Sequence, residues 1–161
     1  MNTCGHLARE CFLALAKTPQ GLFLVDRMSR RREVRRGFLL ALAWMLSRRI
    51  RQETDKKRVG IVFPPGLGAC VANLAVVFAG KVPVNLNFTL GRSAVQACMD
   101  KADLDCLLTA EAVQSRMPEF PWSEDVAVLD VVVALRKLSK FGTLCLLAGI
   151  RFLPAAWMAN L

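Results

Sequence analysis

The chain has 161 residues, enough for one domain with its own core, and it combines a hydrophobic fraction of 54% with a formal net charge of +9. Its six cysteines are scattered without a CxxC pair, so we expect them to be reduced and packed as small apolar residues. The short apolar run between Cys11 and Ala16 lacks a cleavage site, which excludes a secretory signal and predicts a cytoplasmic protein, peripheral on the inner membrane if it meets lipid.

The positive charge is concentrated in one segment. Between Arg27 and Arg58 the sequence has twelve Lys/Arg and three Asp/Glu, and the rest of the chain is neutral. Such a segment is either a solvated helix face or a surface for anionic lipid, nucleic acid or a phosphorylated ligand. Nucleic acid is the weakest of these candidates because aromatic residues are not interleaved with the basic ones.

The N-terminal third predicts a helix, a strand and a second helix. An amphipathic helix is expected over residues 7–17 and a strand over residues 22–25. Residues 28–32 are polar and basic and predict a turn or hairpin tip. Residues 33–52 have helical apolar spacing, with an apolar middle too short to span a bilayer. We therefore expect Trp44 to pack in the core.

The central stretch predicts a strand, a turn, a buried helix and a second strand. The β-branched run that starts at Val59 must end at Pro64-Pro65-Gly66, because two prolines remove ladder donors and glycine permits a sharp reversal. Residues 68–79 are almost uniformly apolar, so this helix should be buried on most of its circumference, and Gly80 ends it. A strand at residues 82–84 then lies parallel to the first.

The second half continues the alternation of strands and helices. Ser93 and Gln96 fit a capping box that begins a helix. Strands are expected at residues 106–109 and 126–129. Between them we expect a short helix or turn at residues 111–116 and an extended, proline-punctuated connection.

The chain therefore predicts an α/β fold, a Rossmann-like and mostly parallel sheet with flanking helices over residues 1–135, followed by an apolar helical tail over residues 136–161. A membrane span in the tail is disfavoured because Arg151 near its middle would cost about 2.5 to 3.5 kcal/mol there. Two expectations stay open: a helix in the lipid headgroup region, or a helical hairpin packed against other protein. In the first case Trp157 is the interface anchor, and the anionic-lipid contacts are Arg48, Arg49, Arg51, Arg136, Lys137 and Lys140.

One glycine turn invites a nucleotide-binding interpretation. The sequence Gly66-Leu67-Gly68 opens a helix, where backbone amides can hold a phosphate. The third glycine position of a dinucleotide fingerprint holds Val71. The next strand ends in Asn85 and Asn87, where an acidic ribose ligand is needed. The match is poor, and we assign no cofactor-binding residue to it.

Candidate catalytic and metal-ligating residues are equally scarce. His6, the only histidine, lies near Cys4 and Cys11, but three such residues on a terminus do not set up a zinc site. No serine stands in a G-x-S-x-G setting, so a hydrolase triad has no foundation. We assign no catalytic and no metal-ligating residue.

Three features carry a family resemblance: the strand-Pro-Pro-Gly-helix order after Val59, the turn and strand AGKVPVNLN at residues 79–87, and PEFPW at residues 118–122. Together with the residues around them, they resemble the N-terminal part of AMP-forming acyl-activating enzymes, the adenylate-forming superfamily. Within it, the sequence looks most like the acyl-ACP synthetase/2-acylglycerophosphoethanolamine acyltransferase group.

The resemblance implies a two-step reaction, in which a fatty acid carboxylate attacks ATP to give acyl-adenylate and pyrophosphate, and a thiol then takes the acyl group. This chemistry needs a Ser/Thr/Gly-rich phosphate loop, Mg²⁺ and a mobile lysine. In the family these follow the part that this chain resembles, and no family catalytic residue maps onto it. We therefore expect an N-terminal fragment or split subunit, inactive alone, whose partner is a second chain carrying the ATP-binding half.

A non-enzymatic module that binds a membrane surface or a protein partner is the alternative expectation. It is motivated by the basic segment and the apolar tail. Exchange of pyrophosphate into ATP would distinguish an acid-activating enzyme, and flotation with anionic liposomes would distinguish the surface-binding module.

Overall fold

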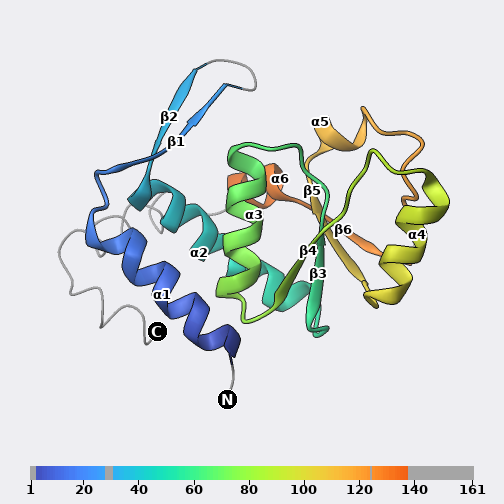
Figure 1. Cartoon of the computed structure of the whole chain (residues 1–161), viewed down its shortest axis with the longest axis horizontal. Coiled ribbons are helices and arrows are strands. Elements are labelled where there is room, and N and C mark those ends of the chain that lie inside the picture. The colour runs from blue at the N-terminus through green and yellow to red at the C-terminus, as the bar shows by residue number, and fades with distance from the viewer. Residues whose placement is uncertain (1–2, 28–30, 124, 138–161) are drawn as a thin grey trace.

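A four-stranded parallel sheet lies at the centre of the molecule, with helices on both faces (Figure 1). The structure is a computed structural model, and it describes residues 3–27, 31–123 and 125–137, without the side chains of residues 3–6 and 137. In chain order the elements are α1 Thr3–Lys17, β1 Leu22–Asp26, β2 Arg32–Arg35, α2 Arg36–Glu53, β3 Arg58–Ile61, α3 Leu67–Phe78, β4 Val82–Asn85, α4 Arg92–Lys101, β5 Cys106–Thr109, α5 Glu111–Gln114, β6 Ala127–Asp130 and α6 Val131–Lys137. The expected α/β fold with a parallel sheet is confirmed.

The strand order of the sheet is β4-β3-β5-β6, and every neighbouring pair is parallel. The chain leaves β3 through α3 to reach β4 on one side. It then returns through α4 to β5 on the other side of β3. Because crossovers between parallel strands have one preferred hand, this reversal of direction puts α3 and α4 on opposite faces of the sheet.

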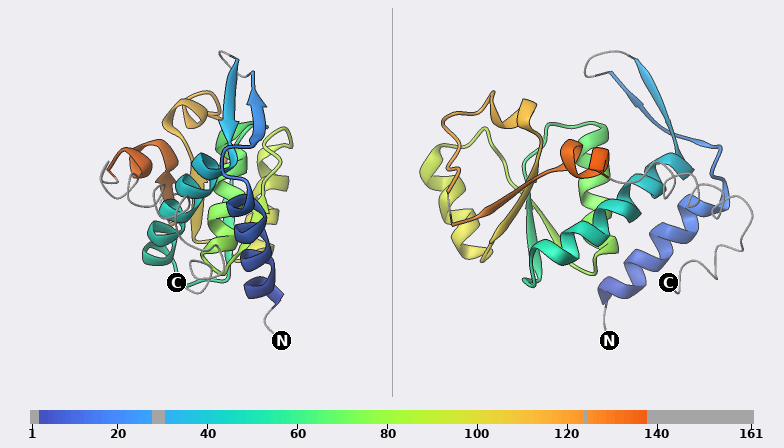
Figure 2. Two further views of the ribbon diagram at one scale, coloured as in Figure 1. Left: turned by 90° about the vertical axis from the view of Figure 1, so that its left-hand side faces the viewer. Right: turned by 180° about the vertical axis from the view of Figure 1, so that it is seen from behind.

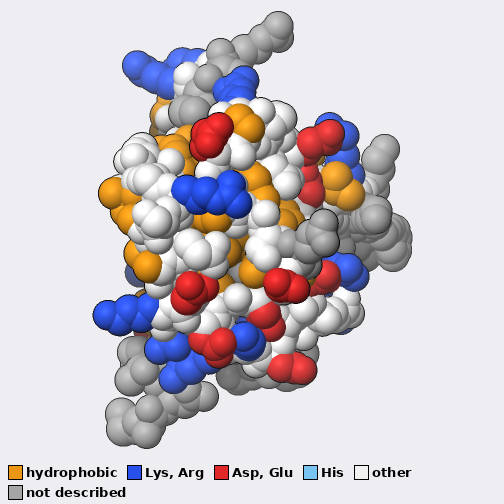
Figure 3. Space-filling model, turned by 90° about the vertical axis from the view of Figure 1, so that its right-hand side faces the viewer, with side chains coloured by type: hydrophobic (Ala, Val, Ile, Leu, Met, Phe, Trp, Pro, Cys, Tyr) orange, Lys and Arg blue, Asp and Glu red, His pale blue; other side chains and the backbone are white. Residues whose placement is uncertain are grey.

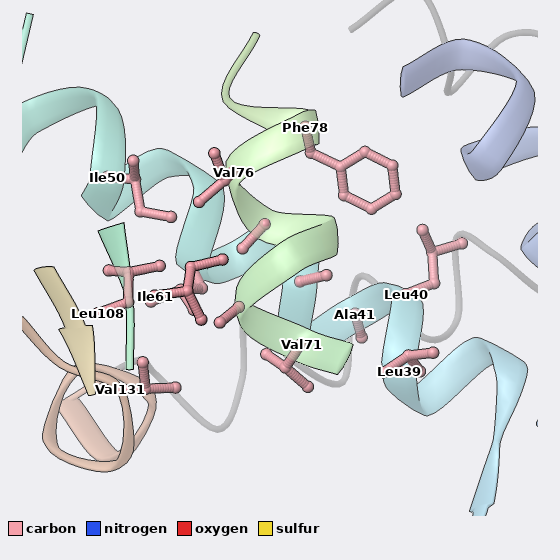
Figure 4. Close-up of a cluster of buried hydrophobic side chains, with 14 of the residues drawn as sticks. Leu39, Leu40, Ala41, Ile50, Ile61, Val71, Val76, Phe78, Leu108 and Val131 are labelled. Atoms are coloured by element: carbon pink, nitrogen blue, oxygen red, sulfur yellow. The ribbon is translucent and has the colours of Figure 1, made fainter. Parts of the chain in front are cut away.

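Alternate residues of the strands point into two separate cores. Cys106 and Leu108 of β5 join the first core, whereas Leu107 between them joins the second. The first core is the larger one and packs the sheet against α2, α3 and α6, while α1 packs on α2 and α3. Figure 4 shows side chains of this core converging between α2, α3 and the strands. The second core packs the other face against α4 and the segment after α5.

Three aromatic rings join the N-terminal helices. The ring centroid of Trp44 lies 5.5 Å from that of Phe12 in α1 and 6.2 Å from that of Phe78 in α3, both edge-to-face. Such pairs each add about 0.5 to 1.5 kcal/mol beyond the area that they bury. The expectation that Trp44 packs in the core is confirmed. Every residue of α3 is buried or half-buried, as its apolar sequence predicts.

The hairpin of β1 and β2 stands apart from the main sheet and projects from the α2 end of the molecule (Figure 2). The expectation of a helix from residue 33 is wrong at its start, because residues 33–35 belong to β2. Val34 is buried while Glu33 and Arg35 are exposed, which is the period of two that a strand requires. The helical spacing begins only at Arg36, where α2 starts.

The capping box expected at α4 is wrong. The helix starts at Arg92 with Gly91 as its N-cap, so Ser93 is already inside the first turn and makes no capping hydrogen bond. Gln96 instead donates from Nε2 to Asp100 Oδ1 at 2.8 Å, one turn further along. The chain enters the helix earlier than a cap at Ser93 requires.

The two edges of the sheet differ in their outward backbone donors. On β4, the amides of Val82 and Leu86 donate to Lys57 O and Ile61 O, on the side of β3. Successive backbone nitrogens of a strand point to opposite sides, so the nitrogen of Pro83 points to the open edge, and a proline nitrogen carries no hydrogen. On β6, the amide of Ala127 donates to Asp105 O at 2.8 Å, which turns the amide of Val128 outward. The β4 edge therefore lacks a donor that the β6 edge retains.

Within the described ranges, none of the helices combines the length and the apolar character that crossing a bilayer requires. The predicted boundary at residue 135 falls inside α6, and the tail that follows residue 137 lies outside the described residues.

Candidate functional site at the carboxyl edge of the sheet

Ligands of open parallel sheets bind outside the carboxyl ends of the strands, where the strand order reverses. In this chain that place lies between β3 and β5. Backbone and side chain cross-link the two strand ends there: Val62 N donates to Leu108 O at 2.9 Å, and the buried hydroxyl of Thr109 donates to Val62 O at 3.0 Å. The floor of the candidate site is therefore a fixed, hydrogen-bonded platform.

The N-terminus of α3 opens at this edge, and a carboxylate of the same chain already faces it. Asp26 at the end of β1 accepts a hydrogen bond through Oδ2 from Leu67 N at 3.2 Å. A helix N-terminus carries a partial positive charge that favours such an anion. The position that a phosphate would take in the dinucleotide interpretation is thus occupied by Asp26, in agreement with the poor sequence match.

The glycines of this turn have a packing role. A Cβ on Gly68 would lie 2.8 Å from Cε1 and 2.9 Å from Cδ1 of Phe63, which is closer than carbon atoms pack. Gly66 has φ +152°, a backbone conformation that side chains rarely adopt. The close packing of the turn against Phe63 is therefore sufficient to explain the two glycines, without a ligand.

The two asparagines at the end of β4 are both engaged within the fold. Asn85 and Asn73 exchange a reciprocal pair of amide hydrogen bonds at 3.0 and 2.9 Å, which ties β4 to α3. Asn87 accepts from the amide and the hydroxyl of Thr89 at 3.1 and 2.7 Å and shapes the turn before α4. These side chains position backbone at the edge of the sheet.

Asp130 completes the carboxyl edge, and sequence reasoning did not single it out. Its Oδ2 accepts from Glu111 N at 2.6 Å and its Oδ1 accepts from Val133 N at 2.7 Å, so one carboxylate serves the first turns of α5 and α6. The sequence feature that could have predicted this role is the position of the aspartate, between an expected strand and an apolar run.

Two thiols of the described residues, those of Cys70 and Cys106, are harder to ionise than a free thiol. Burial raises the pKa of Cys106 to about 12, with Asp105 adding to the effect. Burial also raises the pKa of Cys70, and the charge of Asp26 contributes. Over the described ranges no His, Cys, Asp and Glu side chains gather in a group that could hold a metal ion, while the side chains of Cys4 and His6 lie outside those ranges.

The expected lipid contacts are only partly placed by the structure. Arg48, Arg49 and Arg51 are exposed in the last turns of α2, and Arg49 Nη2 pairs with Glu53 Oε2 at 2.9 Å. Arg51 Nη2 lies 3.4 Å from Ser47 Oγ, and Arg136 is exposed on α6. The side chain of Lys137 and the whole of Lys140 and Trp157 lie outside the described residues, so their roles stay predictions.

No protein-family model matches this sequence, and a search of curated proteins finds no similar sequence. Solved structures do match. The chain is similar to the nonribosomal peptide synthetase FmoA3 in its α-methyl-L-serine-AMP bound form, with 19% identity over 83% of this chain and 15% of that one, and a TM-score of 0.71.

The N-terminal subdomain of NpsA from Klebsiella oxytoca in complex with 3-hydroxyanthranilyl-AMSN is also similar, with 14% identity, 81% and 32% coverage and a TM-score of 0.66. An artificial adenylation-PCP fusion of NpsA and ThdA matches with 14% identity, 83% and 26% coverage and a TM-score of 0.67. The chain thus has the fold of an N-terminal subdomain of adenylation domains, and it spans about a third or less of the length of these proteins.

Proposed function

We propose that this chain provides the N-terminal α/β part of an acid-activating protein, in which an acid and ATP react to form an acyl-adenylate. The observation that carries the proposal is the structural match over more than four fifths of the chain to adenylation proteins, two of which are named with an acyl-adenylate or its analogue bound. The sequence resemblance to the same superfamily, carried by residues 58–122, supports it independently.

The carboxyl edge of the sheet suits a supporting role in such a reaction. Its polar groups are hydrogen-bonded within the fold. Asp26 accepts from the first turn of α3, Asp130 accepts from the first turns of α5 and α6, and Asn85 pairs with Asn73. We propose that these contacts keep rigid the wall that this chain contributes to a substrate cleft. We propose that the phosphate loop, the Mg²⁺ ligands and the mobile lysine of the reaction come from sequence outside these 161 residues, and that the chain is inactive alone.

We further propose that the acid is a fatty acid and that the product enters phospholipid acylation. The resemblance to acyl-ACP synthetases and the apolar sequence after residue 136 support this choice. FmoA3 and the NpsA subdomain carry a serine derivative and an aminobenzoate derivative, so the acid class is the part of the proposal that needs its own measurement.

The proposed partner is a second polypeptide segment with the ATP-binding half. The β6 side of the sheet supports its docking, because the outward amide of Val128 can pair with an added strand. Exposed apolar side chains lie on the same strand and on the helix that follows it: Val128 is 37% exposed, and Val132 and Val133 of α6 are 44% and 41% exposed. Burying them would add to the backbone pairing.

The test begins with the reading frame that follows the coding sequence. A frame encoding a Ser/Thr/Gly-rich phosphate loop and a later lysine domain would supply the partner, and its product should co-purify with this chain on co-expression. The pair should exchange labelled pyrophosphate into ATP with a long-chain fatty acid, whereas this chain alone should not.

The controls separate the parts of the proposal. Exchange with anthranilate or serine but not with fatty acid would refute the fatty acid and retain acid activation. Pyrophosphate exchange by the purified chain alone would refute the proposal that the ATP-binding half lies outside it. A Val128→Lys/Val132→Lys variant should lose co-purification, and the matched exposed pair Ala94→Lys/Ala97→Lys on α4 should keep it.

A membrane-surface module is the second candidate. The exposure of Arg48 and Arg51, one helical turn apart at the end of α2, favours it.

A further inference from the structure

A cavity of about 340 Å³ opens on the face of the sheet opposite α2 and α3. Its walls are the turn that follows β4, the first turn of α4, and the segment between α5 and β6. Its volume is in the range of small-molecule sites in proteins. Figure 3 shows this side of the molecule, with hydrophobic side chains around a basic one in the upper half and a largely charged lower half.

The floor of the cavity is apolar and belongs to the second core. Val95 and Phe120 are buried, and Phe88 and Met117 pack against the same cluster. The position of the Phe120 region is fixed by Trp122, whose ring lies 4.3 Å from that of Phe120 and whose Nε1 donates to Met117 O at 2.9 Å. The cavity is therefore held open by packed residues rather than by exposed loops alone.

Two arginines contribute to the cavity from different segments. Arg92 begins α4, and Arg116 follows α5. Within the described part of the chain, neither guanidinium makes a side-chain hydrogen bond or an ion pair. Glu119 also lines the cavity, and no ion pair joins it to either arginine in the same part of the chain. The three side chains leave one net positive charge.

We propose that this cavity binds a small organic monocarboxylate with an apolar body. The apolar floor would cover the body of the ligand, and its planar carboxylate would accept hydrogen bonds from the forked guanidinium groups. The single net charge matches one negative charge on the ligand. A dianionic phosphate would leave a charge uncompensated next to Glu119.

This site shares none of the residues that hold the N-termini of α3, α5 and α6 at the carboxyl edge. It lies on the α4 face, away from Asp26 and the N-terminus of α3, and it needs only residues of this chain. Failure of ATP exchange would therefore leave it untouched, and failure of carboxylate binding would leave the acid-activation proposal untouched.

The experiment titrates the full chain with octanoate and follows the backbone amides by ¹H–¹⁵N NMR. The largest shifts should fall in residues 88–95 and 116–121. Neutral octanamide should bind about tenfold more weakly, which corresponds to about 1.4 kcal/mol for one charge-assisted hydrogen bond. Octyl phosphate should bind no more tightly than octanoate.

Variants identify the charges that act. Arg92→Gln and Arg116→Gln should each weaken octanoate binding by about fivefold, because a partly solvated ion pair is worth about 1 kcal/mol. Glu119→Gln should strengthen it. The matched control is Lys17→Gln, an exposed cation at the end of α1, whose helix packs into the first core on the opposite side of the sheet; it should leave the affinity unchanged.

A steric variant provides a test that does not involve charge. Gly91 lines the cavity with φ −61°, and a Cβ there would meet no atom within 4 Å, so Gly91→Leu should fold, narrow the space and weaken octanoate binding. Its folding is verified by the dispersion of the same spectra. Equal affinity for octanamide, tighter binding of octyl phosphate, shifts outside the two segments, or equal effects of Lys17→Gln and Arg92→Gln would each overturn the proposal.

Discussion

Cys106 lies inside β5 with no exposed surface and behaves as a small apolar side chain, as the scattered cysteine pattern predicts. The polar residues near the carboxyl edge also serve the fold: Asp26 and Asp130 satisfy backbone amides of helices that begin elsewhere in the chain. The partner of Asp26 cannot be predicted from the sequence, because 41 positions separate it from Leu67 and no local pattern links them.

Cys106 gives a prediction for alkaline pH. Its pKa is about 12 in the folded protein and about 9 in the unfolded chain, so the thiol ionises first in the unfolded state. Stability should be unaffected below the unfolded value and fall above it, by about 1 kcal/mol per pH unit, until the folded thiol also ionises. Urea denaturation at a series of pH values from about 8 to about 11 measures this fall.

The comparison variant for that measurement is Cys106→Ala. It should be less stable at every pH because of the cavity, but its stability should decline less steeply above about pH 9. Cys98→Ala, at an exposed position on α4, should keep the slope of the original protein. Identical slopes for the original protein and Cys106→Ala would contradict the assignment.

At the scale of elements, strands and buried helices follow from the sequence, and the points where some helices begin do not. The strand at 106–109 and the helix after Pro64-Pro65-Gly66 are predicted well, because apolar runs bounded by turn residues leave little choice. The strand β2 is not predicted, because four residues with one buried valine resemble the start of a helix. Residues 32–35 form a strand because they pair with β1, and a local sequence pattern does not show a contact between two segments.

Gly60 gives the sharpest prediction for an element. A Cβ at this position in β3 would collide with Leu107 of β5 and lie 3.0 Å from Leu104, and both side chains are buried in the second core. Gly60→Ala should therefore lower the free energy of unfolding by about 1 to 3 kcal/mol, the usual cost of overpacking. Chemical denaturation measures this decrease.

The matched control is Gly91→Ala, where a Cβ meets open space. It should change stability by no more than about 1 kcal/mol, mainly through the weaker N-cap. If Gly60→Ala were as mild as this control, the close approach of β3 and β5 would be wrong.

At the scale of the whole molecule, the α/β class and the superfamily resemblance follow from the sequence, and the structure confirms the fold of an N-terminal adenylation subdomain. The space between segments cannot be predicted in this way. The cavity beside α4 combines Phe88 and Arg92 of one stretch with Arg116 of another, and neither stretch forms a motif. Only folding brings them together.

The basic end of α2 gives a prediction for the intact chain. If it meets a membrane, Arg48→Gln/Arg49→Gln/Arg51→Gln should reduce flotation with phosphatidylglycerol vesicles at low salt at least about tenfold, since each surface cation contributes up to about 1 kcal/mol. Arg49 should contribute least, because Glu53 pairs with it.

The matched variant Arg92→Gln/Lys101→Gln/Arg116→Gln removes three exposed charges from the α4 side. It should float like the original protein. Equal decreases in the two triple variants, or binding that persists unchanged in the first, would refute a specific role for α2.

Pro83 determines at which edge of the sheet another strand can be added. Because the outer side of β4 lacks the amide hydrogen at that residue, a neighbouring chain cannot continue the ladder there without a gap, while β6 offers an uninterrupted template. A strand from another molecule would therefore add to the sheet only beside β6. Two copies joined in this way would pair β6 with β6 and form a closed dimer, because neither copy would have a second edge at which a fibre could continue.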